Sequence, residues 1–303
     1  DTYPPRLEVV SLSHYIKIGG SCLTVYNASN DAKRSGVKVG DHFFKGYLTN
    51  FPGIYVAYFA LPWDATTSTP ITLEAQDRAG NINKLSFPHK ILRKKFRSDR
   101  ITVTDSFLNR KMPEFSEGCE RLSGEPLEIY LKVNRELRQK TEQRIENMCQ
   151  KASTDKKLWK GPFLRMKGSP KSLFGDKRSY YYKGKEIDKQ IHLGIDIAAL
   201  EHFPVGAANN GIVIFSNYLG IYGNSIIIDH GQGLCSLYGH LSTTKIESGN
   251  EVKKGDIIGY TGSTGLAGGD HLHFSILVDG MYVNPVEWWD PHWVEDNITE
   301  KLR

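Results

Sequence analysis

The sequence has no long hydrophobic run. No stretch of about 18 or more apolar residues occurs among its 303 residues, so the sequence predicts no transmembrane helix. The chain begins with Asp1 rather than Met, and no apolar signal segment follows. We therefore expect a mature or trimmed form from which an export signal has been removed.

Cysteine is scarce, with four residues in the chain. Cys22 and Cys235 lie in runs that predict strands, and we expect them to be buried thiols. Cys119 and Cys149 bracket a predicted helix and can form a disulfide where the compartment is oxidising. Four cysteines allow three complete pairings, so the sequence leaves the pairing open.

Charge of neither sign dominates the chain. The formal net charge is +5, with 39% hydrophobic and 24% charged residues. This composition provides enough apolar side chains for two or three packed domains. A small positive surplus attracts polyanions of any kind, so charge alone does not identify a partner.

Two short motifs, HLGID and HLH, carry four side chains that can bind a metal. Residues two or four apart on a strand share a face, so His192 pairs with Asp196 and His271 with His273. A catalytic zinc uses three protein ligands and leaves one position for water, whereas a structural zinc closes its shell, often with Cys. No Cys lies at metal-motif spacing here, which favours an open site. His240, in the segment YGHL, is a further candidate.

The residues around these motifs predict a small β domain. Short β-branched or aromatic runs, bounded by Gly, Asn and Asp, occur at 211–216, 224–229, 234–238 and 273–278. They are typical of antiparallel strands joined by tight turns. We therefore expect a mostly β domain with the site in a groove on one sheet.

The stretch from about His192 to Trp289 resembles the lysostaphin-type (LytM-like) zinc endopeptidases, which cut peptide cross-links in bacterial cell walls. The resemblance rests on three elements in the family's order, HLGIDIA, YGHLS and DHLHFSI, and it covers about a third of the chain. It implies a small antiparallel β domain, a barrel or sandwich related to the biotinyl–lipoyl fold.

The resemblance also implies roles for five residues. His192, Asp196 and His273 would hold Zn²⁺, and His240 and His271 would act in catalysis. Bound zinc would supply an activated water and polarise the scissile carbonyl. The two catalytic histidines would move the water proton to the leaving amine and stabilise the oxyanion. Which of them is the general base is left open.

Three functional classes fit parts of the sequence. The leading one is a zinc endopeptidase that hydrolyses stem peptides or cross-links of peptidoglycan. The second is a catalytically silent wall-binding protein or an activator of another wall hydrolase, and the presence of all five expected residues argues against it. The third is a biotinyl or lipoyl carrier, suggested by the Gly-rich stretch at 252–256. A carrier needs no histidine cluster, so it is disfavoured.

An aromatic segment, FGDKRSYYY, directly precedes the first motif. Its position suits a wall of the substrate groove, which makes Arg178, Tyr180 and Tyr182 candidate substrate-binding residues. A guanidinium such as that of Arg178 can receive a substrate carboxylate through two hydrogen bonds. The equal alternative is a strand whose tyrosines pack on the core.

Residues 1–97 have the pattern of a β-sandwich. Runs typical of strands occur at 7–11, 23–26, 53–61 and 71–77. The segment EAQDRAGN at the end of this unit resembles the last hairpin of bacterial immunoglobulin-like modules. We therefore expect an immunoglobulin-like β domain that positions or binds.

Residues 98–160 predict a helical linker region, followed by the peptidase domain at 161–303. From Glu125 to about Ala152, apolar side chains recur near helical spacing among many charged ones, which predicts one long helix. Its charges indicate a solvated face, or alternatively a basic face against the wall.

These expectations place the protein in the cell envelope or periplasm of a bacterium, with peptidoglycan peptides and no nucleic acid as partners. The immunoglobulin-like module and the lack of a recognisable wall-binding repeat favour a Gram-negative periplasm. A wall hydrolase that is always open is dangerous, so we expect the N-terminal or helical region to cover the groove at rest. The scissile bond and the oligomeric state are left open.

Overall fold

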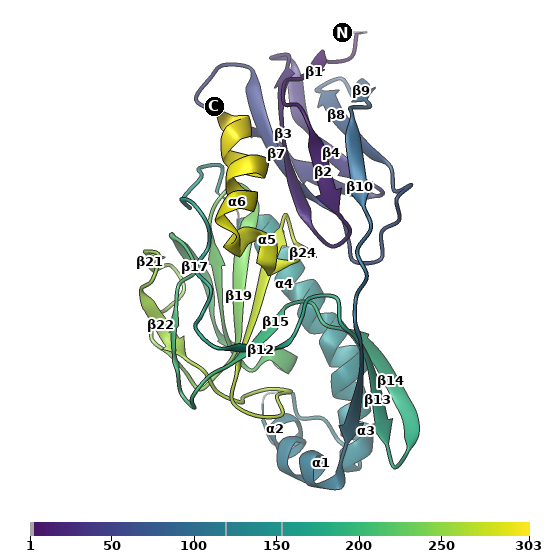
Figure 1. Cartoon of the computed structure of the whole chain (residues 1–303), viewed down its shortest axis with the longest axis vertical. Helices are drawn as coiled ribbons and strands as arrows, with labels where there is room; N and C mark the ends of the chain where they lie inside the picture. Colours follow the sequence, from purple (N-terminus) through teal and green to yellow (C-terminus); the bar gives the residue numbers. More distant parts are fainter. Residues whose placement is uncertain (1–2, 119, 153) are drawn as a thin grey trace.

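The computed structural model describes residues 3–118, 120–152 and 154–303, and the fold is mostly β, as predicted. Figure 1 shows a β-sandwich at one end, a larger β domain below it and a helical segment alongside. Among the described residues, no helix is both long enough and apolar enough to cross a membrane.

The N-terminal residues form two antiparallel four-stranded sheets, so the predicted β-sandwich is confirmed. One sheet has the order β1 (Leu7–Val9), β3 (Ser21–Ala28), β7 (Ile54–Ala60), β6 (Tyr47–Leu48). The other has the order β5 (His42–Lys45), β4 (Ala32–Val39), β8 (Ile71–Asp77), β9 (Ile82–Leu85). A separate parallel pair joins β2 (His14–Lys17) to β10 (His89–Leu92). Large side chains such as Tyr26, Phe44 and Phe59 fill the core between the sheets.

The middle segment contains the predicted long helix and one strand that was not predicted. The strand β11 (Ser98–Val103) comes first, followed by α1 (Asp105–Lys111) and α2 (Pro113–Ser116). A long helical run then consists of α3 (Pro126–Lys132), a π-helical turn (Val133–Leu137) and α4 (Arg138–Ala152). It begins at a capping box between Glu125 and Glu128. The single helix predicted from Glu125 is thus confirmed, with one irregular turn inside it.

Three sheets make up the remaining β structure. The largest has the order β12 (Ser169–Ser172), β15 (Ile195–Ala198), β23 (Leu272–Val278), β19 (Leu234–Leu241), β18 (Asn224–Asp229), β17 (Gly211–Tyr218), β21 (Glu251–Val252), and β24 (Met281–Val283) pairs with β23. A smaller sheet consists of β16 (Pro204–Gly206), β22 (Ile257–Tyr260) and β20 (Thr243–Thr244). The third consists of β11, β13 (Lys177–Tyr182) and β14 (Lys185–Ile191).

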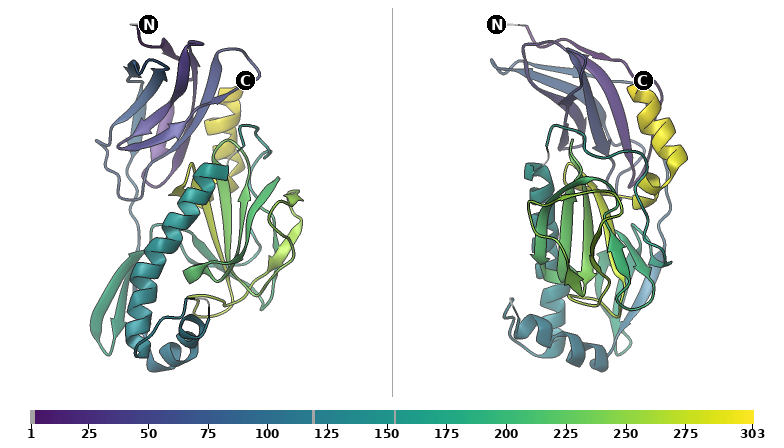
Figure 2. Two further views of the ribbon diagram at one scale, coloured as in Figure 1. Left: turned by 180° about the vertical axis from the view of Figure 1, so that it is seen from behind. Right: turned by 90° about the vertical axis from the view of Figure 1, so that its left-hand side faces the viewer.

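The large sheet is covered on both faces. In β18, Ile226 and Ile228 belong to one hydrophobic core and Ile227 to the other, because successive strand residues point to opposite faces. The core around Ile227 is closed by the long helical run, which lies along the sheet in both views of Figure 2. Covering on both faces explains why this strand is a continuous apolar run.

The buried thiols predicted from the sequence are present. Cys22 lies in β3 and Cys235 in β19, and both are free and buried. Cys149, on α4, is also a free buried thiol and shares a core with Cys235. The suggested partner of Cys149, Cys119, lies outside the described residues.

The C-terminal segment joins the β-sandwich to the large sheet. It contains α5 (Pro285–Trp289) and α6 (Pro291–Val294), a π-helical turn (Glu295–Thr299) and a 3₁₀ turn (Glu300–Leu302), which run beside the sandwich in Figure 1. The indole Nε1 of Trp288 donates to Ser21 Oγ at 3.1 Å, and Ser21 N donates to Glu287 Oε2 at 2.9 Å. Burial raises the pKa of Glu287 to about 7, although Ser21, Lys94 and Lys17 oppose the shift.

The buried Glu287 should make stability depend on pH. Its folded pKa of about 7 lies above the ordinary 4.5, so its stabilising contribution is complete below pH 4.5 and is lost as the pH rises towards 7. Glu287→Gln keeps an acceptor for Ser21 N but carries no charge. We expect the free energy of unfolding of this variant to exceed that of the parent by about 2–3 kcal/mol more at pH 8 than at pH 5 in urea titrations. An equal difference at both pH values would contradict this.

Candidate functional site

Three metal-capable side chains meet where two strands of the large sheet pair. The register places Asp196 of β15 opposite His273 of β23, and His192 lies just before β15. Asp196 Oδ1 is 2.9 Å from both His192 Nε2 and His273 Nδ1, and these two nitrogens are 3.1 Å apart. All three residues are buried. The structure therefore brings together the three residues predicted to hold the metal.

Outer hydrogen bonds set the orientation of the two histidines in this cluster. His192 Nδ1 lies 3.0 Å from the carbonyl oxygen of Leu173, to which it can only donate, so Nε2 keeps its lone pair for a metal. His273 Nε2 lies 2.9 Å from Ser275 Oγ, whose hydroxyl donates to Leu193 O at 2.8 Å. His273 Nδ1 is then free to bind. Partners of this kind fix ring orientation and tautomer in metal sites.

The triad is slightly tighter than an occupied zinc site. A tetrahedral zinc with bonds of about 2.0–2.2 Å spaces its ligand atoms about 3.3–3.5 Å apart. The three ligand atoms here are 2.9–3.1 Å apart, so a shift of a few tenths of an ångström would admit the ion. The same residues line a cavity of about 310 Å³, which leaves the fourth side open. Two imidazoles, one carboxylate and an open side match a catalytic zinc.

Charges in the cluster favour the forms that bind metal. Burial alone would raise the pKa of Asp196, but the histidines around it, His192 first, hold that pKa well below its usual value. Burial lowers the pKa of His192, and it lowers the pKa of His273 to about 4. The carboxylate is therefore charged and both imidazoles are neutral near pH 7.

The two histidines predicted to be catalytic lie at the edge of the triad. His240 is the next-to-last residue of β19 and donates from Nδ1 to Thr264 O at 2.8 Å. His271 donates from Nδ1 to Gly269 O at 2.8 Å. Their ring centroids are 4.8 Å apart, and His271 Nε2 lies 3.6 Å from Asp196 Oδ1. Each ring keeps its Nε2 free for proton transfer.

Electrostatics distinguishes these two histidines. Burial, helped by His271 and His273, pushes the pKa of His240 well below its ordinary value. Burial also acts on His271, but the Asp196 carboxylate beside it raises its pKa above the ordinary value. One neutral imidazole therefore lies beside one that holds a proton more readily.

Backbone geometry explains two residues of the motifs. A Cβ on Gly194 would approach His273 Nε2 to 2.5 Å and Phe274 O to 2.6 Å, so only glycine fits beside the ligand. His240 has a φ of 63°, which is left-handed and strained for a residue with a side chain. Backbone strain of this kind persists only where the surrounding structure enforces it, and strained residues cluster at active sites.

Arg178 of β13 supports the triad from outside. Its Nη2 donates to Asp196 Oδ2 at 2.8 Å, on the oxygen that the histidines do not use. Its buried Nε has no hydrogen-bond partner among the described residues. The predicted substrate-binding residue thus contacts the cluster directly. Tyr180 lines the cavity and also packs in the core around Ile227, whereas Tyr182 is not part of the lining and donates its hydroxyl to Asp105 at 2.6 Å.

The middle segment forms one wall of the cavity. From the sequence we expected the N-terminal or helical region to cover the groove, but no residues of that cover were predicted. The lining of the cavity includes residues of β11, α1, α3 and the start of α4, namely Ile101, Thr102, Val103, Phe107, Tyr130 and Arg138. Arg138 and Tyr130 carry no motif, and nothing in the sequence marks them as part of the site. Tyr222, whose ring lies 4.8 Å from that of His273, was also missed.

Helices α1 and α2 are fastened to the loop that follows β22. Glu114 Oε1 accepts from Gly265 N at 2.6 Å, and Lys111 Nζ donates to Ser263 O at 2.6 Å. Arg110 Nη2 donates to Gly268 O at 3.1 Å. The same loop carries the carbonyl that orients His240, so the helical cover and the catalytic edge share one support.

Removal of Arg178 should weaken metal binding more than it weakens the fold. Loss of an outer partner of a ligand typically costs 10–100-fold in metal affinity. We expect Arg178→Gln to lose zinc affinity by about that factor in competition with a chelator, with little change in circular dichroism. Arg100→Gln, which removes an exposed guanidinium from the neighbouring strand β11, is the matched control. Equal affinities in the two variants would contradict the positioning role.

Comparisons with known proteins match the part of the chain that holds this site. The model of peptidase family M23 matches residues 190–285. The DD-carboxypeptidase/endopeptidase Mpg of Neisseria meningitidis serogroup B is 43% identical over 97 residues, which are 32% of this chain and 22% of that protein. The murein hydrolase activator EnvC of Escherichia coli is 37% identical over 106 residues, 35% of this chain and 25% of that protein. The chain thus spans about a quarter or less of these relatives.

One solved structure resembles the whole arrangement. A candidate peptidase M23 from Pseudomonas aeruginosa has a TM-score of 0.54 and covers 90% of this chain and 94% of its own. At 19% identity, this likeness concerns the fold alone. The family match rests on the sequence around the triad. Residues 190–285 of this chain are therefore a domain of peptidase family M23.

Proposed function

We propose that this protein is a zinc-dependent endopeptidase that hydrolyses peptide cross-links or stem peptides of bacterial peptidoglycan. The observation that carries the proposal is the triad of His192, Asp196 and His273, with its ligand atoms 2.9–3.1 Å apart and its open side facing a cavity. The names of the relatives Mpg and EnvC, an endopeptidase and an activator of a murein hydrolase, support the substrate class.

His192, Asp196 and His273 would hold the zinc, which supplies an acidified water and a polarised carbonyl when bound. His240 and His271 then hold and move protons at their Nε2 atoms. One accepts the proton of the attacking water, and the other stabilises the oxyanion and protonates the leaving amine. No covalent intermediate with the enzyme is required.

The substrate side of the cavity carries positive charge. Arg178 and Arg138 both line it, and Tyr180 lies on the same wall. Arg178 has a buried Nε without a partner, although its Nη2 is engaged by Asp196. We propose that it also receives a carboxylate of the substrate, because peptidoglycan stem peptides carry free carboxylates. Such a substrate places the protein outside the cytoplasm, in the periplasm or cell envelope.

The alternative is a silent activator of another wall hydrolase. It is favoured by one relative, EnvC, and by the helical wall that narrows access to the triad. It is disfavoured by the complete set of ligands and by the two oriented histidines, which an activator does not need. The endopeptidase is therefore the better-supported interpretation.

Zinc content and cleavage test the proposal together. We expect near-stoichiometric zinc in the purified chain and release of new peptide termini from purified peptidoglycan. His271→Ala removes a proton carrier but no zinc ligand, so it should keep its zinc and lose at least about 100-fold in rate. His292→Ala, which removes an exposed histidine, is the control. Zinc and cleavage both absent from the parent would reject the endopeptidase, and zinc without cleavage would favour the activator.

The helical wall predicts a resting state in which the cavity is covered, and loss of the contacts that hold the wall should open it. Asp105 accepts from Tyr182, and Arg110 donates to Gly268, so both tether α1 without touching the zinc ligands. Loss of the two contacts, worth about 1 kcal/mol together, should raise the open fraction and the rate on insoluble peptidoglycan about fivefold in Asp105→Ala/Arg110→Ala. Arg121→Ala/Glu136→Ala, two exposed charges of the same segment, should leave the rate unchanged. A lower or equal rate in the first variant would contradict the cover.

A further inference from the structure

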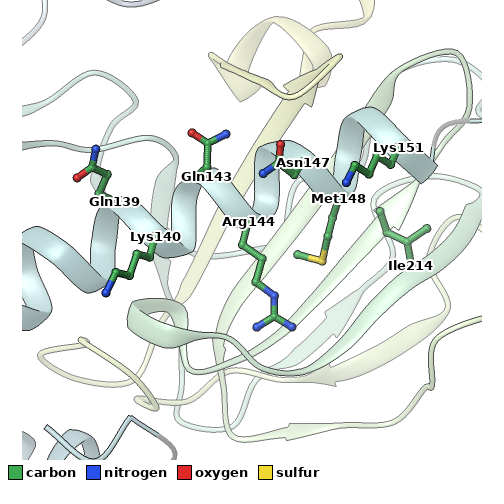
Figure 3. A pocket seen from close by; sticks show the side chains of 8 residues that line it. All are labelled: Gln139, Lys140, Gln143, Arg144, Asn147, Met148, Lys151 and Ile214. Carbon is green, nitrogen blue, oxygen red and sulfur yellow. The ribbon is translucent and has the colours of Figure 1, made fainter.

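A second groove lies beside α4, away from the zinc ligands. It has a volume of about 680 Å³ and is shown in Figure 3. Its lining combines three cations, three amides and two apolar side chains, namely Lys140, Arg144, Lys151, Gln139, Gln143, Asn147, Met148 and Ile214. None of the eight is acidic.

The basic and acidic side chains of α4 lie on different sides of the helix. Lys140, Arg144 and Lys151 follow at i, i+4 and i+11, which places them on one stripe of α4. The two carboxylates of the same stretch, Glu142 and Glu146, lie off this stripe. Both are half-buried, unlike the three cations, and burial raises the pKa of Glu146 and raises that of Glu142 to about 7. Within α4 itself, the outer stripe therefore has no acidic member, and Glu136, in the π-helical turn before it, forms no ion pair with Lys140.

A β-bulge supplies the apolar floor of the groove. The register between β17 and β18 shifts between Val213 and Phe215, so Ile214 is the extra residue. Bulges re-aim side chains, and here Ile214 and Phe215 both pack with the core beneath α4, whereas Val213 belongs to the opposite core. The Arg144 guanidinium lies 5.3 Å from the ring centroid of Phe215. In Figure 3, Arg144 and Met148 extend from α4 on the same side.

The three cations of this groove are not neutralised by any residue that the structure describes. Among residues 3–118, 120–152 and 154–303, no ion pair involves Lys140, Arg144 or Lys151, and all three side chains are exposed. Like charges four residues apart on a helix repel each other. An anionic ligand would relieve this repulsion, so charge complementarity selects an acidic partner.

We propose that this groove binds a carboxylate-bearing strand of peptidoglycan, separately from the catalytic cavity. The cations would pair with stem-peptide carboxylates, and the amides would hydrogen-bond sugar hydroxyls and peptide groups. The apolar floor suits the less polar faces of the sugars. The proposal rests on the proposed function, and it is geometrically linked to it: Arg138 lines the catalytic cavity and the next residue, Gln139, lines the groove.

The groove can be tested by binding without hydrolysis. The full chain carrying His271→Ala, with zinc, is sedimented with purified peptidoglycan sacculi over a range of NaCl concentrations. The added substitutions Lys140→Gln, Arg144→Gln and Lys151→Gln should raise the apparent Kd about tenfold and flatten its salt dependence, since three exposed ion pairs contribute together about a factor of ten. The control set Lys33→Gln, Lys38→Gln and Arg78→Gln removes the same charge from the β-sandwich and should bind like the parent.

The outcomes separate this proposal from the proposed function. An unchanged Kd in the groove variant would overturn the groove, even if the chain with His271 intact cleaves soluble cross-linked muropeptides. Loss of sacculus binding without any muropeptide cleavage by the intact chain would support the groove and reject the endopeptidase. Binding of the parent to phosphatidylglycerol vesicles as tight as to sacculi, lost in the same variant, would overturn peptidoglycan as the occupant.

Discussion

The pairing of β15 with β23 is the constraint on which the rest of the site depends. It places Asp196 and His273 on directly opposed residues, so two ligands separated by 77 positions in the chain meet through backbone hydrogen bonds. His192 lies three residues before β15, so the short segment that leads into this strand brings it to the other two ligands. Arg178 and Ser275 then hold the ligand side chains, and each of them is carried by a strand. Ligands on paired strands are held more rigidly than ligands on loops.

The buried side and the exposed side of the long helical run contribute to different regions of the protein. Its buried side closes the core around Ile227 and forms a wall of the catalytic cavity. Its exposed side carries cations and amides beside an apolar floor. Because β17, β18 and β19 support both regions, binding in the groove and chemistry in the cavity would depend on one rigid sheet.

Much of the fold followed from local pattern, and much of the cavity did not. The spacing in HLGID and HLH predicted which side chains share a face, because strand geometry fixes that locally. The β-sandwich and the long helix were also predicted. The strand β11 was missed, since SDRITV is short and pairs with β13 only through the tertiary fold. Arg138, Tyr130 and Tyr222 reach the cavity through long-range packing, which leaves no periodic signal. Tyr182 was expected at the groove, but it is the last residue of β13, one strand repeat beyond Tyr180, and its hydroxyl donates to Asp105 of α1.

The π-helical turn at Val133–Leu137 carries a consequence for how related chains should be compared. Such a turn takes up one residue more than an α-helical turn. Because the extra residue is absorbed within the turn, α4 after it keeps the facing that a regular helix would have without that residue. A relative that lacks one residue here would therefore present the same stripe of α4 to the solvent, and a single-residue gap within this helix would leave both the cavity wall and the groove in place.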